Sequence, residues 1–489
     1  MAAIITEKFR THNARQFKED FDESASSTYI FIGRSFDWDD ENSPPSPANA
    51  VGEEIDAFAD MIALKKVAPS DVTHGLVRRN YDKTGATSYD EYQHDISTSN
   101  PAVASGATNL YDSRFYVITD EYHVYKCIRT GRDSSGAVIA STVQPTGTSP
   151  TTLVETSDTN AAGGRGYLWK YMYTIGASDT IKFVTNDFIP VKTLGAQTEV
   201  DGETGIGTAA TDDGSSLWDV ENQAVDGAVH HIEVTNGGSG YNDNDYTGVA
   251  ILGDGQNGEC TVHVSGNVVT HITVTTAGSG YKRASIDING ITGIGSGANA
   301  TAKVIISPIY GHGANPVEEL GGNYIIVNSR LEFNEGSGDF PTDNDFRRIG
   351  LIQDPFAKGT TTVSTSDSLT AYNQITVSSV GNISVDDIIM NANSNGSSVA
   401  VSRVVSVDAS TNVVSHIPVA NSGGQFVDFA NSDTIYVDGV QVATTGGSAV
   451  STTHPEVERF TGKIMYIENR GAVTRAADQI EDIKLIVEM

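Results

Sequence analysis

The chain has 489 residues, of which 38% are hydrophobic, so it is long and apolar enough to form about two to four folded domains. Asp and Glu outnumber Lys and Arg by 62 to 31, and the net charge of −31 argues against binding to nucleic acid or to an acidic membrane surface. Two cysteines exclude a disulfide framework and fit synthesis in a reducing cytoplasm, while the polar N-terminal segment and the short apolar runs predict neither a signal peptide nor a transmembrane helix.

The first 195 residues are predicted to be mixed in secondary structure but mainly β, because aromatic and apolar runs alternate with turn residues. Thr11 or Asn13 is placed to cap a short helix that carries two phenylalanines on one face. Residues 51–66 have the apolar spacing of a second helix, which is expected to end near Pro69. Strands are predicted at 29–33, 116–118, 122–128, 167–175 and 188–191.

A second region is organised by repetition. The segment His231–Tyr241, HIEVTNGGSGY, returns as His271–Tyr281, HITVTTAGSGY, at an offset of 40 residues, and the register is expected to hold without gaps through each copy. A fixed period predicts a repeated unit of short strands joined by glycine-rich turns, so residues 196–306 are predicted to be one small β domain of two copies. A third copy of the opening half is predicted at His416–Phe426, within a Ser/Thr/Val-rich region, 359–453, that we interpret as a second β module.

The last residues are predicted to complete sheets that begin far upstream. Residues 463–469 and 483–489 are runs of β-forming residues, the first closed by a turn-like Asn-Arg-Gly. A strand at the chain end must pair its backbone with a strand from elsewhere in the chain. Strands are also predicted at 323–327 and 347–353. The predicted fold is mainly β with a few short helices: an elongated multidomain body of discontinuous segments, 1–195, 307–358 and 454–489, with two inserted small β domains, 196–306 and 359–453.

No motif predicts a cofactor or a catalytic centre. Gly253–Gly258 matches the G-x-G-x-x-G dinucleotide pattern, but that motif needs a helix after the glycines, and a strand-forming run follows here. The sequence has no G-x-S-x-G elbow, no phosphate-binding P-loop and no H-E-x-x-H zinc motif. We therefore expect no cofactor, no resident metal and no enzymatic activity.

Two patterns suggest metal ligands but have simpler interpretations. His231, His271 and His416 recur at one position of the repeat, but no His or Cys pair with zinc spacing accompanies them. They are interpreted as strand residues whose rings pack on a neighbouring turn and bond to the backbone. The glycine- and aspartate-rich segment 237–245 is similar to Ca²⁺-binding β-roll loops, but those loops have a nonapeptide period, and a turn explains the glycines more simply. Whether Ca²⁺ binds there is left open.

Short motifs in the body segments follow one another in a recognisable order. They are Thr6–Thr11, Phe31–Trp38, Val77–Arg79, Tyr125–Cys127, Gly166–Tyr171, Thr185–Ile189, Phe346-Arg347, Met465–Arg470 and Asp478–Ile483. In this order they resemble the baseplate wedge subunits of T-even-type contractile-tailed phages. The resemblance spans a little over half of the chain and skips the two inserted modules.

The resemblance implies a structural and mostly β protein of the virion tail baseplate, made in the host cytoplasm. It implies a subunit that self-associates as a homodimer and joins other baseplate wedge proteins around the central tail hub. Fibre or peripheral baseplate proteins are possible further partners through the inserted modules. On host contact, such a subunit is expected to move as a rigid body about its interfaces.

Four side chains of the body are candidate interface residues: Trp38, Arg78, Arg79 and Trp169. Large aromatic and arginine side chains contribute most at protein interfaces. For the basic pair Arg78-Arg79, and for a second pair at residues 347–348, the alternative interpretation is an intramolecular ion pair.

A glycan-binding or fibre-docking module of the virion surface is the alternative function. In that hypothesis Tyr241 and Tyr281 of the two repeats are the rings on which a ligand stacks. A tail-associated glycan hydrolase is a third hypothesis, against which the missing catalytic motifs argue.

Overall fold

The structure is a computed structural model that describes residues 4–23, 25–161, 164–195, 211–332, 340–342, 344–476 and 479–489. Residues 196–210 of the first predicted module and Asp478 of the closing motif lie outside this range. The chain divides into two compact units: unit 1 comprises 1–15, 73–326 and 486–489, and unit 2 comprises 16–72 and 327–485. Strands make up 40% of the chain and helices 11%, so the predicted mainly β class is confirmed. None of the described helices has the length and apolarity needed to cross a lipid bilayer.

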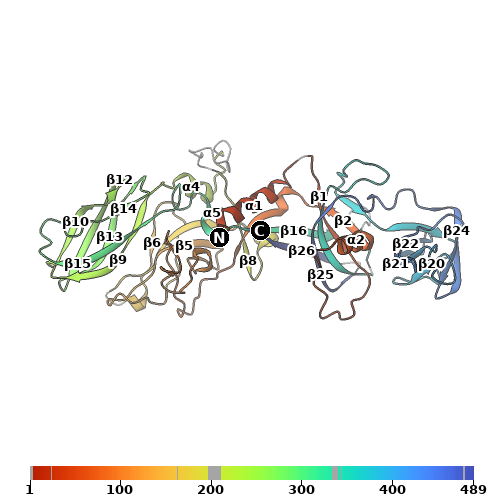
Figure 1. The fold of residues 1–489 in the computed structure, drawn as a ribbon, viewed down its shortest axis with the longest axis horizontal. Helices are drawn as coiled ribbons and strands as arrows, with labels where there is room; N and C mark the ends of the chain where they lie inside the picture. Colours follow the sequence, from red (N-terminus) through yellow and green to blue (C-terminus); the bar gives the residue numbers. More distant parts are fainter. Residues whose placement is uncertain are drawn as a thin grey trace. The chain divides into compact units, whose positions relative to one another are not determined.

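Unit 2 contains a five-stranded antiparallel sheet with the order β18-β2-β1-β17-β25 (Figure 1). Its strands are β1 (Thr28–Gly33), β2 (Met61–Lys66), β17 (Asn344–Gln353), β18 (Ser368–Thr370) and β25 (Lys463–Arg475). Strand β17 pairs with β1 on one side and with β25 on the other. The C-terminal run therefore pairs into a sheet that begins with the N-terminal strand, as the sequence predicts.

The two N-terminal helices differ from their predicted bounds. Helix α1 (Glu7–Glu19) begins before Thr11 and Asn13, because the Thr6 hydroxyl accepts a hydrogen bond from the backbone N–H of Phe9 at 3.3 Å and caps the helix. Helix α2 (Val51–Asp60) is shorter than predicted, because residues 61–66 form β2. This segment pairs with β1 and with β18, and its first four residues are all buried, as in a strand covered on both faces. Strand pairing thus overrides the helical spacing of the sequence.

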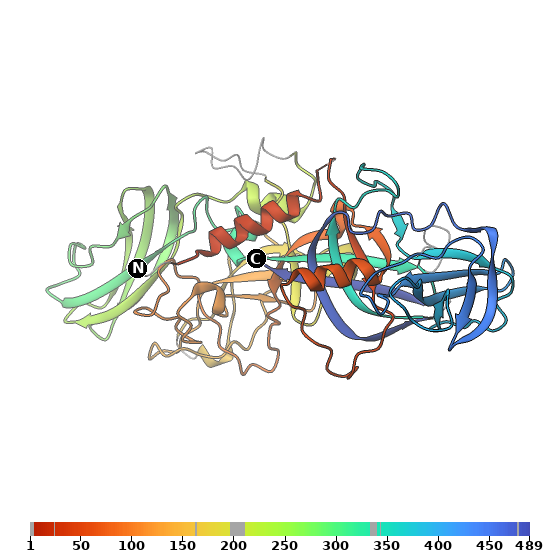
Figure 2. The same ribbon diagram turned by 45° about the vertical axis from the view of Figure 1, so that its right-hand side comes forward.

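A closed six-stranded barrel, drawn in shades of blue in Figure 2, also belongs to unit 2. Its strand order is β19-β22-β21-β20-β23-β24, and β24 pairs back onto β19. Ile389, Val404, Val414 and Ile435 are fully buried inside it. The strands are β19 (Asn373–Val377), β20 (Ile388–Met390), β21 (Val401–Asp408), β22 (Val413–Pro418), β23 (Thr434–Val437) and β24 (Val440–Val450).

Two four-stranded sheets are also formed by the described residues, and the first lies within unit 1. The first has the order β4-β5-β7-β6, with β4 (Tyr116–Ile118), β5 (His123–Arg129), β6 (Val154–Glu155) and β7 (Leu168–Thr174). The second has the order β26-β16-β3-β8, with β3 (Val72–Val77), β8 (Phe188–Val191), β16 (Tyr324–Glu332) and β26 (Ile480–Glu488). The shorter helices are α3 (Ala177–Phe183), α4 (Ser216–Asn222), α5 (Pro316–Leu320) and three 3₁₀ turns, η1 (Pro69–Asp71), η2 (Leu110–Asp112) and η3 (Thr159–Ala161).

The repeat region forms a β module of unit 1 with its own hydrophobic core (Figure 1). Its main strands are β9 (Val229–Ser239), β10 (Asn244–Ala250), β12 (Gln256–Ser265), β13 (Val268–Ser279) and β15 (Ala298–Ile306), with β11 (Leu252–Gly253) and β14 (Ala284–Ser285) as a short pair. Strands β9 and β15 pair in the same way as β13 and β12.

The predicted gapless register is wrong in the second half of the repeat. Gln256 pairs with Ser279, and the equivalent residue of the other copy, Ala298, pairs with Ser239. From 256 to 298 the offset is 42 residues, whereas from 239 to 279 it is 40. The longer copy therefore carries two additional residues in the glycine-rich loop before β15, where a turn accepts insertions more easily than a strand does.

The predicted third copy at His416–Phe426 is not a structural copy. Strands β9 and β13 continue through their glycines to a serine, whereas β22 ends at Pro418 and Asn421 closes a tight turn. Tyr241 and Tyr281 are buried, but Phe426 at the equivalent spacing is only half-buried. The likeness is limited to the strand that begins each segment.

The buried His416 is expected to make the barrel sensitive to acid. Neither ring nitrogen has a hydrogen-bond partner among the described residues, and burial lowers the pKa of His416 to about 3. The unfolded chain has a histidine pKa of about 6.5, so stability is complete above that pH and is lost as the pH falls toward 3. Between pH 6.5 and 5 the loss is about 2 kcal/mol.

Replacing His416→Leu removes this proton-linked loss. Thermal unfolding at pH 7 and pH 5 is expected to show the variant gaining about 2 kcal/mol over the wild type at the lower pH. The control His12→Leu, which removes an exposed imidazole of α1, should leave the acid dependence unchanged. Equal acid sensitivity of wild type and H416L would contradict the prediction.

Candidate functional site

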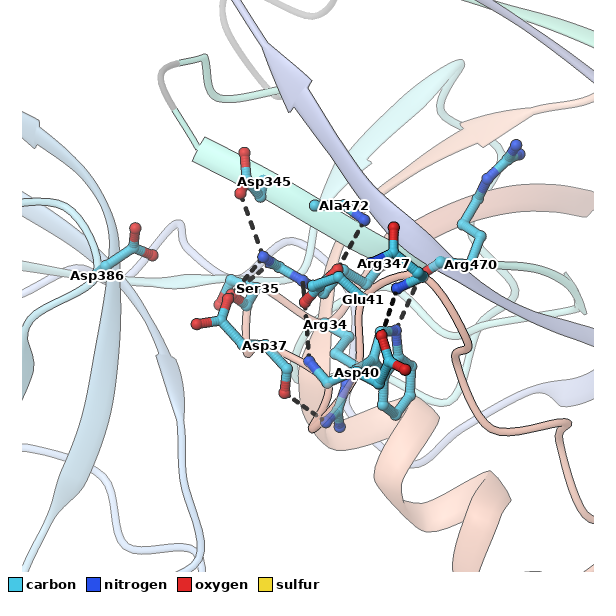
Figure 3. A network of polar contacts seen from close by, with 12 residues as sticks. Arg34, Ser35, Asp37, Asp40, Glu41, Asp345, Arg347, Asp386, Arg470 and Ala472 are labelled. Carbon is cyan, nitrogen blue, oxygen red and sulfur yellow. Dashed lines mark hydrogen bonds and ion pairs between the residues drawn. The ribbon is translucent and has the colours of Figure 1, made fainter.

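A buried arginine fixes the loop after β1 to the five-stranded sheet of unit 2 (Figure 3). Arg347 lies on β17, and its side chain is only 4% exposed. Its Nε donates to Glu41 Oε1 at 2.6 Å, its Nη1 donates to the carbonyl of Ser35 at 3.0 Å, and its Nη2 donates to Asp37 Oδ1 at 2.6 Å. A further contact to Asp345 Oδ2 spans 3.3 Å. One guanidinium thus binds three separate points of the loop.

The same loop also fixes the irregular part of β25. The turn predicted at Asn469–Gly471 is not a turn, because β25 continues to Arg475 and the pairing with β17 shifts register there. Such a bulge leaves backbone groups without ladder partners. The indole Nε1 of Trp38 donates to the carbonyl of Arg470 at 2.8 Å, and the backbone N–H of Ala472 donates to Glu41 Oε2 at 2.9 Å.

Trp38 and Glu41 each make several of these contacts. The guanidinium of Arg34 lies 3.5 Å from the centre of the Trp38 ring, a cation–π contact. The backbone N–H of Trp38 donates to Glu41 Oε1 at 2.9 Å. Burial raises the pKa of Glu41, but hydrogen bonds from the N–H of Trp38, from Arg347 and from Ala472 outweigh it and lower the pKa below the usual value. Glu41 therefore stays an anion and an acceptor.

The neighbouring Arg348 forms a parallel network. Its Nη1 donates to Asp60 Oδ2 at 3.0 Å, its Nη2 to Glu53 Oε1 at 2.8 Å and its Nε to Asn469 Oδ1 at 3.0 Å. The intramolecular ion-pair interpretation of the basic pair at 347–348 is therefore confirmed. These donors all meet carboxylates, carbonyls or an amide, so the arrangement positions backbone and offers no activated nucleophile.

Arg78 and Arg79 of unit 1 lie just after β3 and contact the backbone. Arg78 Nη1 donates to the carbonyl of Thr185 at 2.8 Å, and Arg79 Nη2 donates to that of Tyr111 at 2.9 Å. In the described part of the chain neither arginine has a carboxylate partner, and both are half-buried. The ion-pair alternative does not hold for this pair, and an interface role stays a prediction.

Trp169 is a core residue. Its side chain is 0% exposed and packs between Tyr167, 5.6 Å away between ring centres, and Tyr89, 5.5 Å away. A fully buried ring offers no surface to a partner, so the prediction that Trp169 is an interface residue is wrong. The aromatic residues of the sequence motif Gly166–Tyr171 serve packing instead.

Tyr241 and Tyr281 are also core residues, with 1% and 2% exposure. The Tyr281 hydroxyl donates to the carbonyl of Ile251 at 3.0 Å and accepts from the N–H of Gly258 at 3.1 Å. A Cβ at Gly255 would meet the Tyr281 ring at 2.4 Å, and one at Gly297 would meet the Tyr241 ring at 2.3 Å, so these glycines make room for the rings. Neither ring presents a face on which a ligand could stack.

The other patterns of the sequence have structural roles. Strand β12 begins at Gln256, within the segment Gly253–Gly258, so the helix that a dinucleotide requires is not formed there. Asp243 accepts the backbone N–H groups of Gly266 and Asn267 at 3.1 and 2.7 Å, as a turn cap. Asp245 lies 2.7 Å from His263 Nδ1. Within the residues that the structure describes, no group of three or more His, Cys, Asp or Glu side chains could hold a metal ion.

The three recurring histidines lie on strands, as interpreted, but their contacts differ. His271 stacks on His263 with ring centres 4.1 Å apart. His416 meets Phe429 edge-on at 5.3 Å and makes no hydrogen bond among the described residues. His231 Nε2 lies 3.5 Å from Glu91 Oε2 and also lacks a hydrogen-bond partner there. The predicted bond to the backbone is therefore not formed by these nitrogens.

One charged cluster of unit 1 is not evident from the sequence. Lys126 on β5 bonds to Glu319 on α5 and, at 2.9 Å, to His312 Nδ1, and it lies 3.7 Å from the centre of the Tyr92 ring. Burial lowers the pKa of Lys126 to about 8 although Glu319 opposes the shift. For Glu319, burial alone would raise the pKa, but Lys126 and His312 lower it to about 2. Only the fold brings these distant residues together.

Comparison with known proteins finds a similarity to one phage protein family in the N-terminal part of the chain. Residues 3–201 match the family model described as Bacteriophage T4, Gp8. The chain is also similar to the baseplate wedge protein gp8 of Enterobacteria phage T4, with 29% identity over 218 residues, which is 39% of this chain and 60% of that protein. Residues 3–201 are thus similar to the phage T4 Gp8 family, and the chain shows distant homology to a baseplate wedge protein.

The residues that match the family model include the loop after β1 that Arg347 binds. Arg34, Ser35 and Trp38 lie within residues 3–201, and their partners Arg347 and Arg470 belong to the other motifs of the resemblance. Three motifs that are far apart in the sequence thus meet in one network of unit 2 (Figure 3). The chain spans about 60% of the length of the relative, so what that protein does comes to this chain only as a proposal.

Removing the charge of Arg347 is expected to destabilise unit 2. In Arg347→Met, Glu41 and the carbonyl of Ser35 lose their partner, but Asp37 is 74% exposed and loses little, so we expect a loss of about 2–3 kcal/mol. Denaturant unfolding should show the loss, and hydrogen exchange should show faster exchange at residues 34–43. Arg470→Met keeps the carbonyl that Trp38 uses and should change stability by less than about 0.5 kcal/mol. Equal stability of R347M and R470M would refute the role of Arg347.

Removing the hydroxyl of Tyr281 tests whether this side chain stabilises the core of the repeat module. Tyr281→Phe keeps an aromatic face but removes both hydrogen bonds, so we expect a loss of about 1–3 kcal/mol in thermal unfolding. Tyr122→Phe, at an exposed tyrosine of the same unit, is the matched control and should be neutral. A stable Y281F variant would show that the hydroxyl does not hold the repeat together.

Proposed function

We propose that this protein is a structural component of a phage tail baseplate wedge and works in the virion tail. The observation that carries the proposal is the match of residues 3–201 to the phage T4 Gp8 family together with the similarity to a baseplate wedge protein. The proposal includes a homodimer and contacts with other baseplate wedge proteins. It includes no enzymatic activity, because the polar networks described above hold backbone in place.

In the proposed mechanism each unit acts as a rigid piece. Arg347 and Arg348 tie strands, loop and helix of unit 2 through buried ion pairs, and the Lys126 cluster does the same in unit 1. Rigid pieces keep neighbouring wedge proteins at fixed distances and move as bodies when the baseplate rearranges. We propose residues 1–195, 307–358 and 454–489 as the wedge body, with 196–306 and 359–453 as insertions. The insertions would contact fibres or peripheral baseplate proteins.

Arg78 and Arg79 are the interface residues that we favour. Both are half-buried cations that make no ion pair among the described residues, so a carboxylate of a partner would complete their charge balance. Trp38 stays a candidate, since its indole is half-buried although it bonds within unit 2. The glycan-binding alternative loses its main support, because Tyr241 and Tyr281 are buried.

Mass measurements in solution test the proposal. We expect light scattering to give the mass of a homodimer, and mixtures with the other wedge proteins of the same phage to give larger complexes. Arg78→Gln with Arg79→Gln should weaken one of these associations at least tenfold, and Arg114→Gln, at an exposed arginine of the same unit, should not. A wild-type protein that stays monomeric and binds none of these proteins would overturn the proposal.

A further inference from the structure

A pocket of about 410 Å³ lies within unit 1, beside the repeat module. One wall consists of residues 129–130, 132–136 and 164–165, from the end of β5 and the segment that precedes β7. The other wall consists of residues 231–237 on β9 and 268–271 on β13. This volume exceeds that of a single ion and falls in the range of small-molecule sites. Nothing in the wedge role requires such a cavity.

Three arginines line the pocket, and their partners differ. Arg132 Nη2 donates to Glu233 Oε1 at 2.9 Å and is neutralised by it. Arg129 is ion-paired to Glu155 and donates to the carbonyl of Gly166 at 2.9 Å. Arg165 Nη1 donates to the carbonyl of Ile272 at 3.2 Å, and no carboxylate of the described residues lies within ion-pair distance of it. Arg165 is therefore a cation without an ion pair among the described residues, and Glu155 acts on it only from a greater distance.

The carboxylates of the pocket are already engaged. Glu233 binds Arg132, and Asp133 Oδ1 accepts the backbone N–H groups of Ser135 and Ala137 at 2.8 and 3.0 Å. The lining has three arginines and two carboxylates, and Glu155, just outside the lining, pairs with Arg129. Of the three arginines, Arg165 is the one that makes no ion pair among the described residues.

Burial and neighbouring cations lower the pKa values of two groups in the lining. Burial, and after it the neighbouring cation Arg129, lowers the pKa of Arg165 to about 10. Burial, followed by the charges of Arg129 and Arg165, lowers the pKa of His231 well below its usual value. The Nε atom of Arg129 has no hydrogen-bond partner among the described residues. A bound oxyanion would accept a hydrogen bond from this Nε and would lie beside the charge of Arg165.

We propose that this pocket binds an anionic molecule of sugar size, with its carboxylate or phosphate group between Arg129 and Arg165. Guanidinium groups bind both kinds of oxyanion through paired hydrogen bonds. The walls carry hydroxyl and amide side chains, among them Ser134, Thr235 and Asn236, which suit the hydroxyl groups of a polyol. The site is independent of the proposed function, because its occupant touches one protein only.

Calorimetric titration of the full chain tests the site with glucuronate, glucose 6-phosphate, neutral glucose and inorganic phosphate. We expect saturable binding of at least one acidic sugar, at least tenfold tighter than glucose or inorganic phosphate. Arg165→Gln should weaken this binding at least tenfold, and Arg165→Lys should weaken it less. Arg283→Gln, at an exposed arginine of the same module outside the pocket, should bind like the wild type.

The outcomes separate the parts of the proposal. Arg165 makes a single hydrogen bond to a carbonyl, so R165Q is expected to fold, and its melting temperature is measured beside the titration. No saturable binding of either acidic sugar to the wild type would overturn the proposal. So would equal binding of glucose, equal binding of inorganic phosphate, or unchanged binding by a folded R165Q. If R165Q does not fold, R165K is tested in its place. An affinity of R165K equal to that of the wild type would also overturn the proposal.

Discussion

The fold of unit 2 depends on burying positive charge inside an acidic chain. Arg347 and Arg348 stand side by side on β17, and in a strand successive side chains point to opposite faces of the sheet. One guanidinium therefore meets the loop after β1, and the other meets α2 and Asn469. An unpaired buried arginine would cost several kcal/mol, so the acidic loop and the helix must be in place when the sheet forms. The two neighbouring residues thus couple three distant segments.

The excess of acidic residues affects the net charge of the chain and also the partners of its buried cations. With twice as many carboxylates as cations, at least half of the acidic side chains cannot each have a cation of their own. Several buried cations, such as Arg347, Lys126 and Arg475, meet at least one carboxylate, whereas the buried Lys170 donates to a carbonyl. Cations are therefore concentrated where segments must be joined. This distribution explains why an arginine without a carboxylate, such as Arg165 or Arg79, stands out.

Sequence reasoning succeeds where a segment's own pattern decides its structure. Tyr116–Ile118 and Phe188–Val191 are short apolar runs between turn residues, and the strands there have the predicted bounds. It fails where a distant partner decides. Residues 61–66 have helical spacing, but β1 and β18 draw them into a sheet. The 469–471 segment reads as a turn, yet Trp38 and Glu41 hold it as a bulge. The arginine pairs of the candidate site are visible in the sequence, but their partners lie too far away along the chain to be assigned. The burial of Trp169, Tyr241 and Tyr281 depends on packing between distant segments, which the sequence pattern does not give.

Closure of the barrel affects how copies of the chain can associate at high protein concentration. A sheet that ends in an unpaired strand offers a row of free donors and acceptors, and another chain can dock there and continue the ladder. Because β24 returns to β19, this ring presents no such row. An additional β domain built as a ring can thus be added to an already β-rich chain without giving its copies a means to polymerise through their backbones.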